Sequence, residues 1–529
     1  MFNRSADAIR SSTSILYLLF SLQFLHLCYT LCLDDKYRPQ LHYSPSKHWM
    51  NDPNGLIYLD GEYHLFYQYN PNATVSGQVY WGHAISTDLV HWTELPIALS
   101  PNDIIDVEPV SLFSGCAVLD AKNSSGLQTG SITPMILFFT QATTKKQQQS
   151  IAVSNDRGRT FEMYSKNPVI PNDDEKVPDF RDPKIFNWKD KWIMMVAAGD
   201  KIQFLESDNL LNWNSISEFG ARPLQGSHGG VWECPDLLPF TVNGQRVYVL
   251  LVSINPGGPN QGSATQYFVG SFNGKQFLKS VLYQPLWLDW GPDNYAGVSW
   301  FNEPNNRSLL IAWMSNWDYG KFLPTSAWRG QMTLPRVLNV QRLDGRLRLQ
   351  SQPAAEVDSL RISSQFFETT QPLSIRTGHD FTNDLGFRNS LLEVDVLIDT
   401  QLMFSDSLAY LRLCLFNDLA EEVCVGYSFG SNEIHLDRSM SGDTSFYSEF
   451  AAVATANRES KNRYLQMKVY LDVSSIEVFV DGGFTTMTGL FFPTEAFTRV
   501  KVEFNSAKGI NQLTLLSATI RGLKSIYDC

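Results

Sequence analysis

Short apolar runs separated by Gly, Asn, Asp or Pro recur along almost the whole chain, and this pattern constrains the fold more than any other feature. Runs of this kind, bounded by turn residues, are typical of β-strands, whereas long amphipathic helices are hard to find. The 34 Gly, 25 Pro and 13 % aromatic residues fit the same interpretation. We therefore expect an all-β protein. The clearest strand-like runs are residues 61–69, 134–140, 191–198, 246–253 and 308–314.

A weak repeat divides the first two-thirds of the chain. Each unit is a polar loop that ends in a large aromatic residue, and these residues are Trp92, Phe161, Trp213 and Phe277. Each unit fits one four-stranded sheet with a hairpin turn near its end. Repetition at this period, without helices between the units, favours a β-propeller. Ordinary hairpins in a β-sandwich are the alternative.

The pattern changes after Arg336, where alternating strands typical of a β-sandwich begin. We expect a propeller over residues 38–345, a linker over 346–358 and a sandwich over 359–529. The sandwich region has fewer acidic residues near proline, so we expect it to support the first domain rather than supply chemistry.

The first 32 residues are interpreted as a secretory signal region. Arg4 and Arg10 form a basic start, and an apolar run follows from Ile15 to about Leu33. An uncleaved membrane anchor is the alternative, although Gln23 and His26 make this run a poor span. No other stretch is long enough, so we expect a secreted protein with no membrane contact after cleavage.

Charge and cysteine content narrow the choice of partners. The chain has 42 Lys and Arg against 54 Asp and Glu, a formal charge of −12, which argues against nucleic acid. No Cys/His spacing or calcium loop points to a metal site, and we expect no cofactor. Cys414 and Cys424 flank a turn-like segment and could bridge a hairpin. Sequons at three positions offer N-glycan sites on the secretory route: Asn72, Asn123 and Asn306.

Three acidic residues share an unusual local sequence. Asp52, Asp182 and Glu233 each precede a proline by one or two residues, and a strand-like run follows each of them. Proline marks a strand start or edge, because it cannot donate to a ladder. Equivalent strand edges of propeller blades converge on the central channel, so the three acids could meet around one ligand. Such a group fits glycoside hydrolysis, with one carboxylate as nucleophile or base and another as acid; metal binding is the rival use.

Several longer motifs, in the order found here, resemble glycoside hydrolase family 32, the family of invertases, levanases and exo-inulinases. The resemblance runs from about residue 38 to 525 and implies a five-bladed propeller followed by a β-sandwich. The motifs are WMNDPNG (49–55), FYQYNP (66–71), WGHAIS (81–86), FSG (113–115), FRDP (180–183), QGSHGGVWECPDL (225–237), LDWGPDNYA (288–296) and DVSSIEVFVDGG (472–483).

The resemblance also implies roles in a retaining mechanism on β-fructofuranosyl bonds. Asp52 would be the nucleophile, Glu233 the acid and then the base, and Asp182 the residue that stabilises the transition state. The residues implied to bind the sugar are Asn51, Gln68, Ser114, Arg181, Trp317 and Trp49, the last of which could equally be a buried core residue.

One position departs from the family pattern. Relatives usually have Trp-Gly where Ser76-Gly77 stands, and this Trp forms an apolar floor for the sugar. We expect either an open floor or another ring, such as Tyr80, in its place. His228 and Cys234 also lie near the acids, and we interpret them as a solvated loop residue and a small buried residue.

The leading functional prediction is a secreted invertase-type β-fructofuranosidase acting on sucrose and related fructans. An exo-levanase or exo-inulinase and a fructosyltransferase are alternatives on the same site, and QGSHGGVWECPDL is more similar to levanases than to invertases. A sugar-binding protein without activity is a fourth hypothesis, disfavoured by the intact acids.

Overall fold

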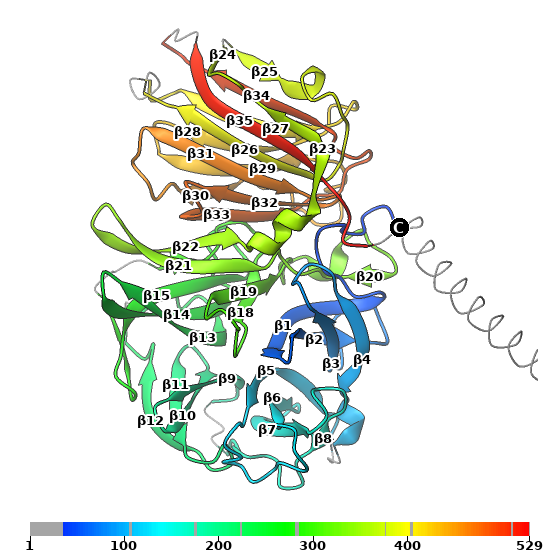
Figure 1. Cartoon of the computed structure of the whole chain (residues 1–529), viewed down its shortest axis with the longest axis vertical. Helices are drawn as coiled ribbons and strands as arrows, with labels where there is room; N and C mark the ends of the chain where they lie inside the picture. Colours follow the sequence, from blue (N-terminus) through cyan, green and yellow to red (C-terminus); the bar gives the residue numbers. More distant parts are fainter. Residues whose placement is uncertain are drawn as a thin grey trace, which may run out of the picture.

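The computed structural model describes residues 35–527, except 105–107, 174–176, 223–224, 281–284, 376, 402–405 and 509–511. The expected signal region, residues 1–32, lies outside these residues. The described chain forms a ring of five sheets with a two-sheet sandwich stacked against one side of it (Figure 1). None of the helices in this part of the chain is long and apolar enough to cross a membrane.

The ring is a five-bladed β-propeller in which each blade is an antiparallel sheet that runs outward from the central channel. Blade 1 contains β1 (His48–Leu59), β2 (Glu62–Asn70), β3 (Tyr80–Ser86) and β4 (Thr93–Leu99). Blade 2 contains β5 (Ser111–Leu119), β6 (Met135–Ala142), β7 (Gln147–Ser154) and β8 (Glu162–Met163). Blade 3 contains β9 (Phe180–Trp188), β10 (Lys191–Ala198), β11 (Ile202–Ser207) and β12 (Asn214–Phe219).

The last two blades carry additional short strands. Blade 4 contains β13 (Val231–Val242), β14 (Gln245–Asn255), β15 (Ala264–Phe272) and β16 (Phe277–Lys279), with β17 (Leu286–Trp287) paired to β15. Blade 5 contains β18 (Tyr295–Ser299), β19 (Ser308–Trp313), β21 (Arg336–Leu343) and β22 (Arg346–Pro353). A further short strand, β20 (Trp328–Arg329), lies between β19 and β21 in the sequence and pairs in parallel with β1 of blade 1.

The repeat seen in the sequence marks one position of the blade. Trp92, Phe161, Trp213 and Phe277 stand immediately before or at the start of β4, β8, β12 and β16, the outermost strand of blades 1 to 4. Blade 5 makes the same turn with Asp344-Gly345 and has no aromatic residue there. Each loop therefore leads into the last strand of a sheet, as the propeller hypothesis required.

The expected linker over residues 346–358 is wrong in its largest part. Residues 346–353 form β22, which pairs with β21 from Leu343 opposite Arg346 to Arg336 opposite Pro353. Ala354 alone separates β22 from the 3-10 helix η3 (Ala355–Leu360). The polar sequence of this segment belongs to the outer strand of blade 5, whose central residues 348–351 are buried, and the N–H of Ser351 donates to the carbonyl of Gly483 in the second domain.

The second domain consists of two antiparallel sheets that enclose one apolar core (Figure 1). Alternate residues of each strand point inward, such as Val394 and Val396 from one sheet and Leu411 and Leu413 from the other. One sheet contains β23 (Arg361–Glu368), β24 (Leu373–Ile375), β26 (Leu392–Asp399), β31 (Tyr464–Leu471), β32 (Ser475–Val480), β33 (Thr485–Leu490) and β35 (Leu513–Leu523). The other contains β25 (Gly378–Asp380), β27 (Tyr410–Phe416), β28 (Glu422–Ser428), β29 (Glu433–Met440), β30 (Ala454–Asn457) and β34 (Arg499–Asn505). The remaining 3-10 turns are η1 (Pro101–Asp103), η2 (Gly320–Phe322) and η4 (Phe381–Asn383).

The hairpin disulfide expected from the sequence is present. Cys414 on β27 and Cys424 on β28 are directly opposite in the antiparallel register and are joined by a disulfide bond. Two further cysteines of the described chain, Cys116 and Cys234, are free and buried.

Candidate active site

All five innermost strands of the propeller carry a β-bulge where they line the channel. In four of these strands two residues stand opposite one residue of the next strand, and these pairs are Asn51-Asp52 in β1, Asp182-Pro183 in β9, Cys234-Pro235 in β13 and Ala296-Gly297 in β18. In β5 the extra residue is Ser114. A bulge turns a side chain away from the regular alternation of the sheet and is tolerated at a strand with a free edge. The repeated bulges therefore direct polar side chains into the channel.

The prolines next to the three acids lie at these bulges rather than at the strand starts expected from the sequence. Pro183 and Pro235 stand in the unpaired part of the register, and Pro53, opposite Tyr67, is the first paired residue after the bulge at Asp52. The other edge of each of these strands faces the channel at this point. A residue that lacks an N–H group fits there because no ladder partner is required. The neighbouring backbone is unusual as well, with positive φ at Asp182 (62°) and Cys234 (47°).

A cavity of about 300 Å³ opens at this end of the channel. It collects side chains from β1, β2, β5, β9 and β13, from the loop before β3, and from the loop after β19. Its lining residues are Asn51, Asp52, Gln68, Ser76, Gly77, Val79, Phe113, Arg181, Asp182, Glu233 and Trp317.

The three acids of the cavity have different hydrogen-bond partners. Glu233 accepts from Nε of Arg181 at 3.0 Å and from the hydroxyl of Tyr295. Asp182 accepts from the backbone N–H of Cys234 at 3.0 Å. Asp52 is 7 % exposed, and its Oδ1 has no hydrogen-bond partner among the described residues. Asp52 is therefore the acid with the greatest free capacity to interact with a ligand.

Burial and mutual repulsion make it harder for these acids to ionise. Burial, followed by the charges of Glu233 and Asp182, raises the pKa of Asp52 well above its usual value. Burial and the charge of Glu233 raise the pKa of Asp182 to about 6, against the opposing effect of Arg181. Ionisation of one cavity acid therefore opposes ionisation of the next, a coupling typical of sites that carry out acid–base chemistry.

The residues predicted to bind sugar divide into cavity residues and supporting residues. Asn51, Gln68, Arg181 and Trp317 line the cavity with the three acids. Ser114 is not among the lining residues but accepts a 2.6 Å hydrogen bond from Nε2 of Gln68.

Trp49 does not line the cavity, so the structure corrects its prediction as a sugar contact. Its side chain is buried against Trp313 and Trp317, and its Nε1 donates to Oδ1 of Asn51 at 2.8 Å. Trp49 therefore belongs to the core of blade 1 and orients a cavity residue.

Both halves of the chain match known family descriptions. "Glycosyl hydrolases family 32 N-terminal domain" matches residues 42–353, and "Glycosyl hydrolases family 32 C terminal" matches residues 356–521. The chain belongs to glycoside hydrolase family 32. It is an enzyme of the β-fructofuranosidase type.

Individual family members are similar over nearly the whole chain. A levanase of Bacillus subtilis (strain 168) is 39 % identical over 506 residues, which cover 93 % of this chain and 71 % of the levanase. An extracellular exo-inulinase of Aspergillus awamori is 36 % identical over 502 residues, which cover 88 % and 92 % of the two chains. The crystal structure of exo-inulinase from Aspergillus awamori superposes with a TM-score of 0.84 at 33 % identity, covering 93 % and 99 % of the two chains.

The departure from the family pattern lies at the cavity mouth. Ser76 is exposed and lines the cavity together with Gly77, whereas Tyr80 is buried on β3 and is not a lining residue. The ring expected as a replacement is thus elsewhere, and this side of the family 32 cavity is open. Phe113 supplies an aromatic surface on the adjoining wall.

The two other residues near the acids have supporting roles. His228 stacks on Trp232 and lies 3.0 Å from a carboxylate oxygen of Asp200, outside the cavity lining. Cys234 is 3 % exposed, and its backbone N–H holds Asp182 as described above. Burial and the adjacent carboxylates raise the pKa of the Cys234 thiol well above its usual value, which makes it a poor nucleophile.

Sequence reasoning missed Tyr295, whose hydroxyl donates to Glu233. Its motif, LDWGPDNYA, was recognised, but a tyrosine in an apolar strand gives no sign that its hydroxyl reaches an acid 62 residues earlier in the chain. The contact depends on the packing of blade 4 against blade 5, which brings β18 beside β13.

A metal centre has little support among the described residues. The group of possible metal ligands found among them is Cys414, Glu422 and Cys424. Its two cysteines are joined in the disulfide. The sequon residues Asn72, Asn123 and Asn306 are all exposed and so are accessible to glycosylation.

Proposed function

We propose that this enzyme is a secreted, exo-acting, retaining β-fructofuranosidase that releases terminal fructose from fructans and from sucrose. The observation that carries the proposal is the cavity in which Asp52, Asp182 and Glu233 meet. The levanase and the exo-inulinase, both acting on fructose polymers by their names, favour a fructan as the main substrate.

In this mechanism Asp52 attacks the anomeric carbon while Glu233 protonates the departing oxygen. Glu233 then removes a proton from water, which releases fructose from Asp52. The free Oδ1 of Asp52 suits a nucleophile. Arg181 and Tyr295 hold both oxygens of Glu233 and so fix the direction in which it faces the leaving group.

Asp182 would accept hydrogen bonds from fructosyl hydroxyls and stabilise the transition state. Its carboxylate is anchored by the N–H of Cys234, and its own N–H donates to Oγ1 of Thr140 at 3.0 Å. Asn51, Gln68 and Trp317 would complete the sugar site. These contacts are preorganised, so little rearrangement is needed when substrate binds.

Secretion is part of the same proposal. The Aspergillus relative is named as extracellular, and the present chain has a disulfide and three exposed sequons. The protein would then act outside the cell, as a glycoprotein with N-glycans at Asn72, Asn123 and Asn306, on sugars that diffuse to it.

Product chromatography with sucrose, inulin and levan, each offered alone, tests the activity. Free fructose from the first minute supports exo action, and mixed oligosaccharides contradict it. Fructosylated products that dominate at high sucrose concentration would indicate a transferase. Asp52→Ala should lose nearly all turnover while sugar binding survives, whereas Asp190→Asn, at an exposed blade 3 turn, should leave turnover unchanged.

Binding without turnover of any of the three sugars would indicate a sugar-binding protein. This alternative requires the three acids to have no chemical role. The match of the chain to the family and the meeting of the three acids in one cavity favour the enzyme.

A further inference from the structure

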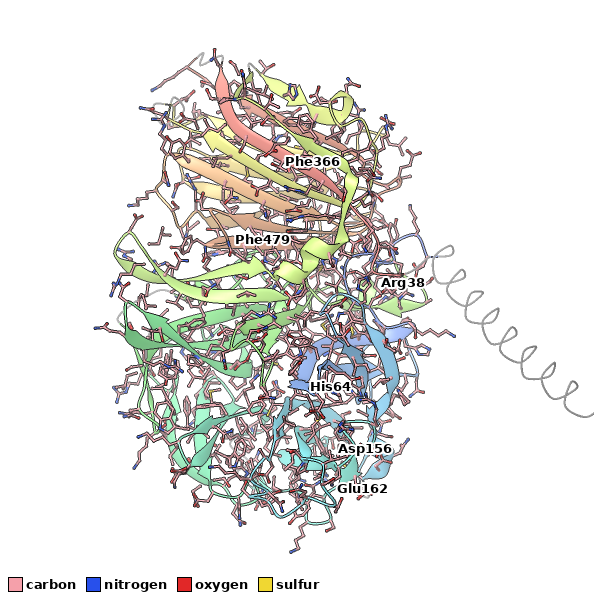
Figure 2. The ribbon with its side chains drawn as sticks, in the orientation of Figure 1. Arg38, His64, Asp156, Glu162, Phe366 and Phe479 are labelled. Carbon is pink, nitrogen blue, oxygen red and sulfur yellow. A yellow bond between two sulfur atoms is a disulfide. The ribbon has the colours of Figure 1, made fainter. Side chains whose placement is uncertain are left out.

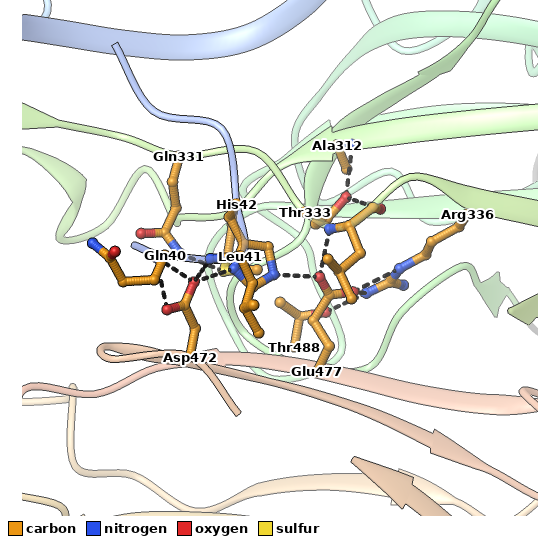
Figure 3. Close-up of polar contacts among 12 residues, drawn as sticks. Gln40, Leu41, His42, Ala312, Gln331, Thr333, Arg336, Asp472, Glu477 and Thr488 are labelled. Carbon is orange, nitrogen blue, oxygen red and sulfur yellow. Dashed lines mark hydrogen bonds and ion pairs between the residues drawn. The ribbon is translucent and has the colours of Figure 1, made fainter. Parts of the chain in front are cut away.

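His42 lies just before β1 and is enclosed between two carboxylates of the sandwich domain (Figure 3). Its Nδ1 is 2.7 Å from Oδ2 of Asp472, and its Nε2 is 3.0 Å from Oε1 of Glu477. None of these three side chains has exposed surface. The first strand of the propeller is thus tied to the second domain by a fully buried polar cluster.

Both carboxylates also accept hydrogen bonds from other donors. Because they offer only acceptors, both ring nitrogens of His42 must donate, and the ring is an imidazolium. Besides His42, Asp472 accepts from the backbone N–H groups of Gln40, Leu41 and Val473, and Glu477 accepts from the N–H of Leu334 and the guanidinium of Arg336.

Glu477 joins the two ends of the propeller ring. Its Oε1 accepts from His42, which leads into blade 1, and from the N–H of Leu334 at 2.6 Å, which leads into β21 of blade 5. Its Oε2 accepts from Nε of Arg336, the first residue of β21, at 2.9 Å. One carboxylate from the second domain therefore bonds the first and the last blade.

Within the propeller, pairing between these two blades is short. β20 pairs with β1 at two positions, His48 opposite Trp328 and Trp49 opposite Arg329, and an isolated bridge joins Ile57 of β1 to Phe301 after β18. Every other pair of neighbouring blades is joined directly along the chain, whereas the first and last blades are not. The rigidity of the ring therefore depends on the contacts at this junction. An external clasp at this junction would therefore affect the whole ring.

The two blades that meet at this junction provide facing walls of the active site. Asn51 and Asp52 stand on β1, whereas Trp317 and Tyr295 belong to blade 5 and its loop. Trp49 on β1 also packs against Trp317, with ring centroids 5.9 Å apart. Movement at the junction would change the spacing of these walls.

We propose that Glu477 and the His42 cation form a clasp through which the sandwich domain closes the propeller ring and positions the blade 1 wall of the active site against the blade 5 wall. Both are positioning residues, since neither lines the cavity. The second domain would then act on catalysis through the ring closure.

The clasp should loosen in alkali. Despite the opposing effect of burial, hydrogen bonds to Asp472 and Glu477 raise the pKa of His42 to about 9. Because this folded value lies above the usual 6.5, the stabilisation is complete below about pH 6.5 and is lost as pH rises through 9. The other charged or titratable groups around the cluster are Arg336, Asp289, Arg38 and Tyr527.

The test compares the wild type, His42→Gln and, as a matched control, His91→Gln, which changes an exposed histidine paired with Asp88. The first readout is the thermal unfolding midpoint from pH 6 to pH 10. The second is kcat/KM at 25 °C on a β-fructofuranoside whose leaving group needs no proton, so that loss of the acid form of Glu233 does not enter. The second readout rests on the proposed function; the first does not.

For the wild type and His91→Gln we expect the unfolding midpoint to fall between pH 7 and pH 10 and kcat/KM to fall roughly tenfold between pH 8 and pH 10. In His42→Gln, kcat/KM should be low and independent of pH between pH 8 and pH 10. Its unfolding midpoint should fall less steeply with pH than that of the wild type. Equal pH slopes in wild type and His42→Gln would overturn the clasp. Fructosidase activity absent from all three proteins would refute the proposed function and leave the unfolding comparison as the test.

Should His42→Gln fail to fold, hydrogen exchange of the wild type provides the same test. After correction for the chemical exchange rate, β1 and β20 should lose protection between pH 8 and pH 10, while β10 of blade 3 keeps it. Unchanged protection of β1 and β20, or an equal loss in β10, would contradict the clasp.

Discussion

Two groups of buried or partly buried carboxylates in the enzyme have opposite surroundings. The cavity acids are Asp52, Asp182 and Glu233, and the interface acids are Asp289, Asp472 and Glu477. The cavity acids face one another with Arg181 as the nearby cation. The interface acids are bonded by two cations, His42 and Arg336, and by several backbone N–H groups.

The pKa values follow this difference. Burial raises the pKa of Asp182 to about 6, whereas Arg336 and His42 overcome the effect of burial and lower the pKa of Glu477. A buried carboxylate whose oxygens are all bonded to cations or N–H groups holds neighbouring segments together. A buried carboxylate with fewer partners remains free to bond a ligand. The comparison thus separates the residues that hold the enzyme together from those that act on substrate.

The largest expected effect on stability comes from removing Arg336, one of the two cations that bond the interface acids. Arg336 is fully buried and bonds both Asp289 and Glu477, so Arg336→Met removes the ion pair of Asp289 and leaves Glu477 with His42 as its remaining cation. We expect a loss of about 3–5 kcal/mol in the free energy of unfolding, measured by urea titration. Arg342→Met, at an exposed position of the same strand β21, is the control and should change it by less than about 0.5 kcal/mol. Similar stability of both variants would mean that the interface acids are not held by Arg336.

Neutralising the cavity acid Asp182 should change the free energy of unfolding in the opposite direction, towards greater stability. Since the folded pKa of Asp182 is about 6 rather than 3.8, its ionisation destabilises the folded state above pH 6, and the penalty disappears below about pH 4. Asp182→Asn should therefore raise the free energy of unfolding by about 1–3 kcal/mol at pH 7, with little gain at pH 4, while activity falls. A destabilised Asp182→Asn protein at pH 7 would show that this acid is paired like those of the interface.

A smaller effect is expected at the open mouth of the cavity. Ser76→Trp adds an apolar surface at the position where the family resemblance leads us to expect one, and among the described residues no other ring fills that position. We expect KM for sucrose to fall by up to about tenfold, with kcat less affected. Val75→Trp, at an exposed neighbour that does not line the cavity, should leave KM unchanged. A rise of KM in Ser76→Trp would mean that the mouth has no room for the ring.

The parts of the fold that depend on local sequence were predictable. The aromatic residues that end polar loops, such as Trp92 and Trp213, identified the outer turns of the blades, because each turn has its own local signal. The acid–proline pairs indicated the channel edge for the same reason. The family resemblance then supplied the number of blades and the order of the domains, which local patterns leave open.

The remaining features depend on contacts between distant segments. The bulges at Asp182 and Cys234 are set by register with the next strand, and the pairing of His42 with Glu477 joins residues 435 positions apart. β22 was missed because a polar outer strand resembles a linker when its partner is unknown. Tyr295 was missed because a buried tyrosine gives no local sign of the acid that it bonds.

The most direct test of the account is the role of Glu233. Glu233→Gln and Glu162→Gln, an exposed glutamate on β8 at the outer edge of blade 2 (Figure 2), are compared on a natural fructan and on a β-fructofuranoside whose leaving group needs no proton. We predict that Glu233→Gln lowers kcat/KM on the fructan by about 10²–10⁴-fold and much less on the activated substrate, while Glu162→Gln changes neither. Equal losses of Glu233→Gln on both substrates would contradict its assignment as the acid of the cavity.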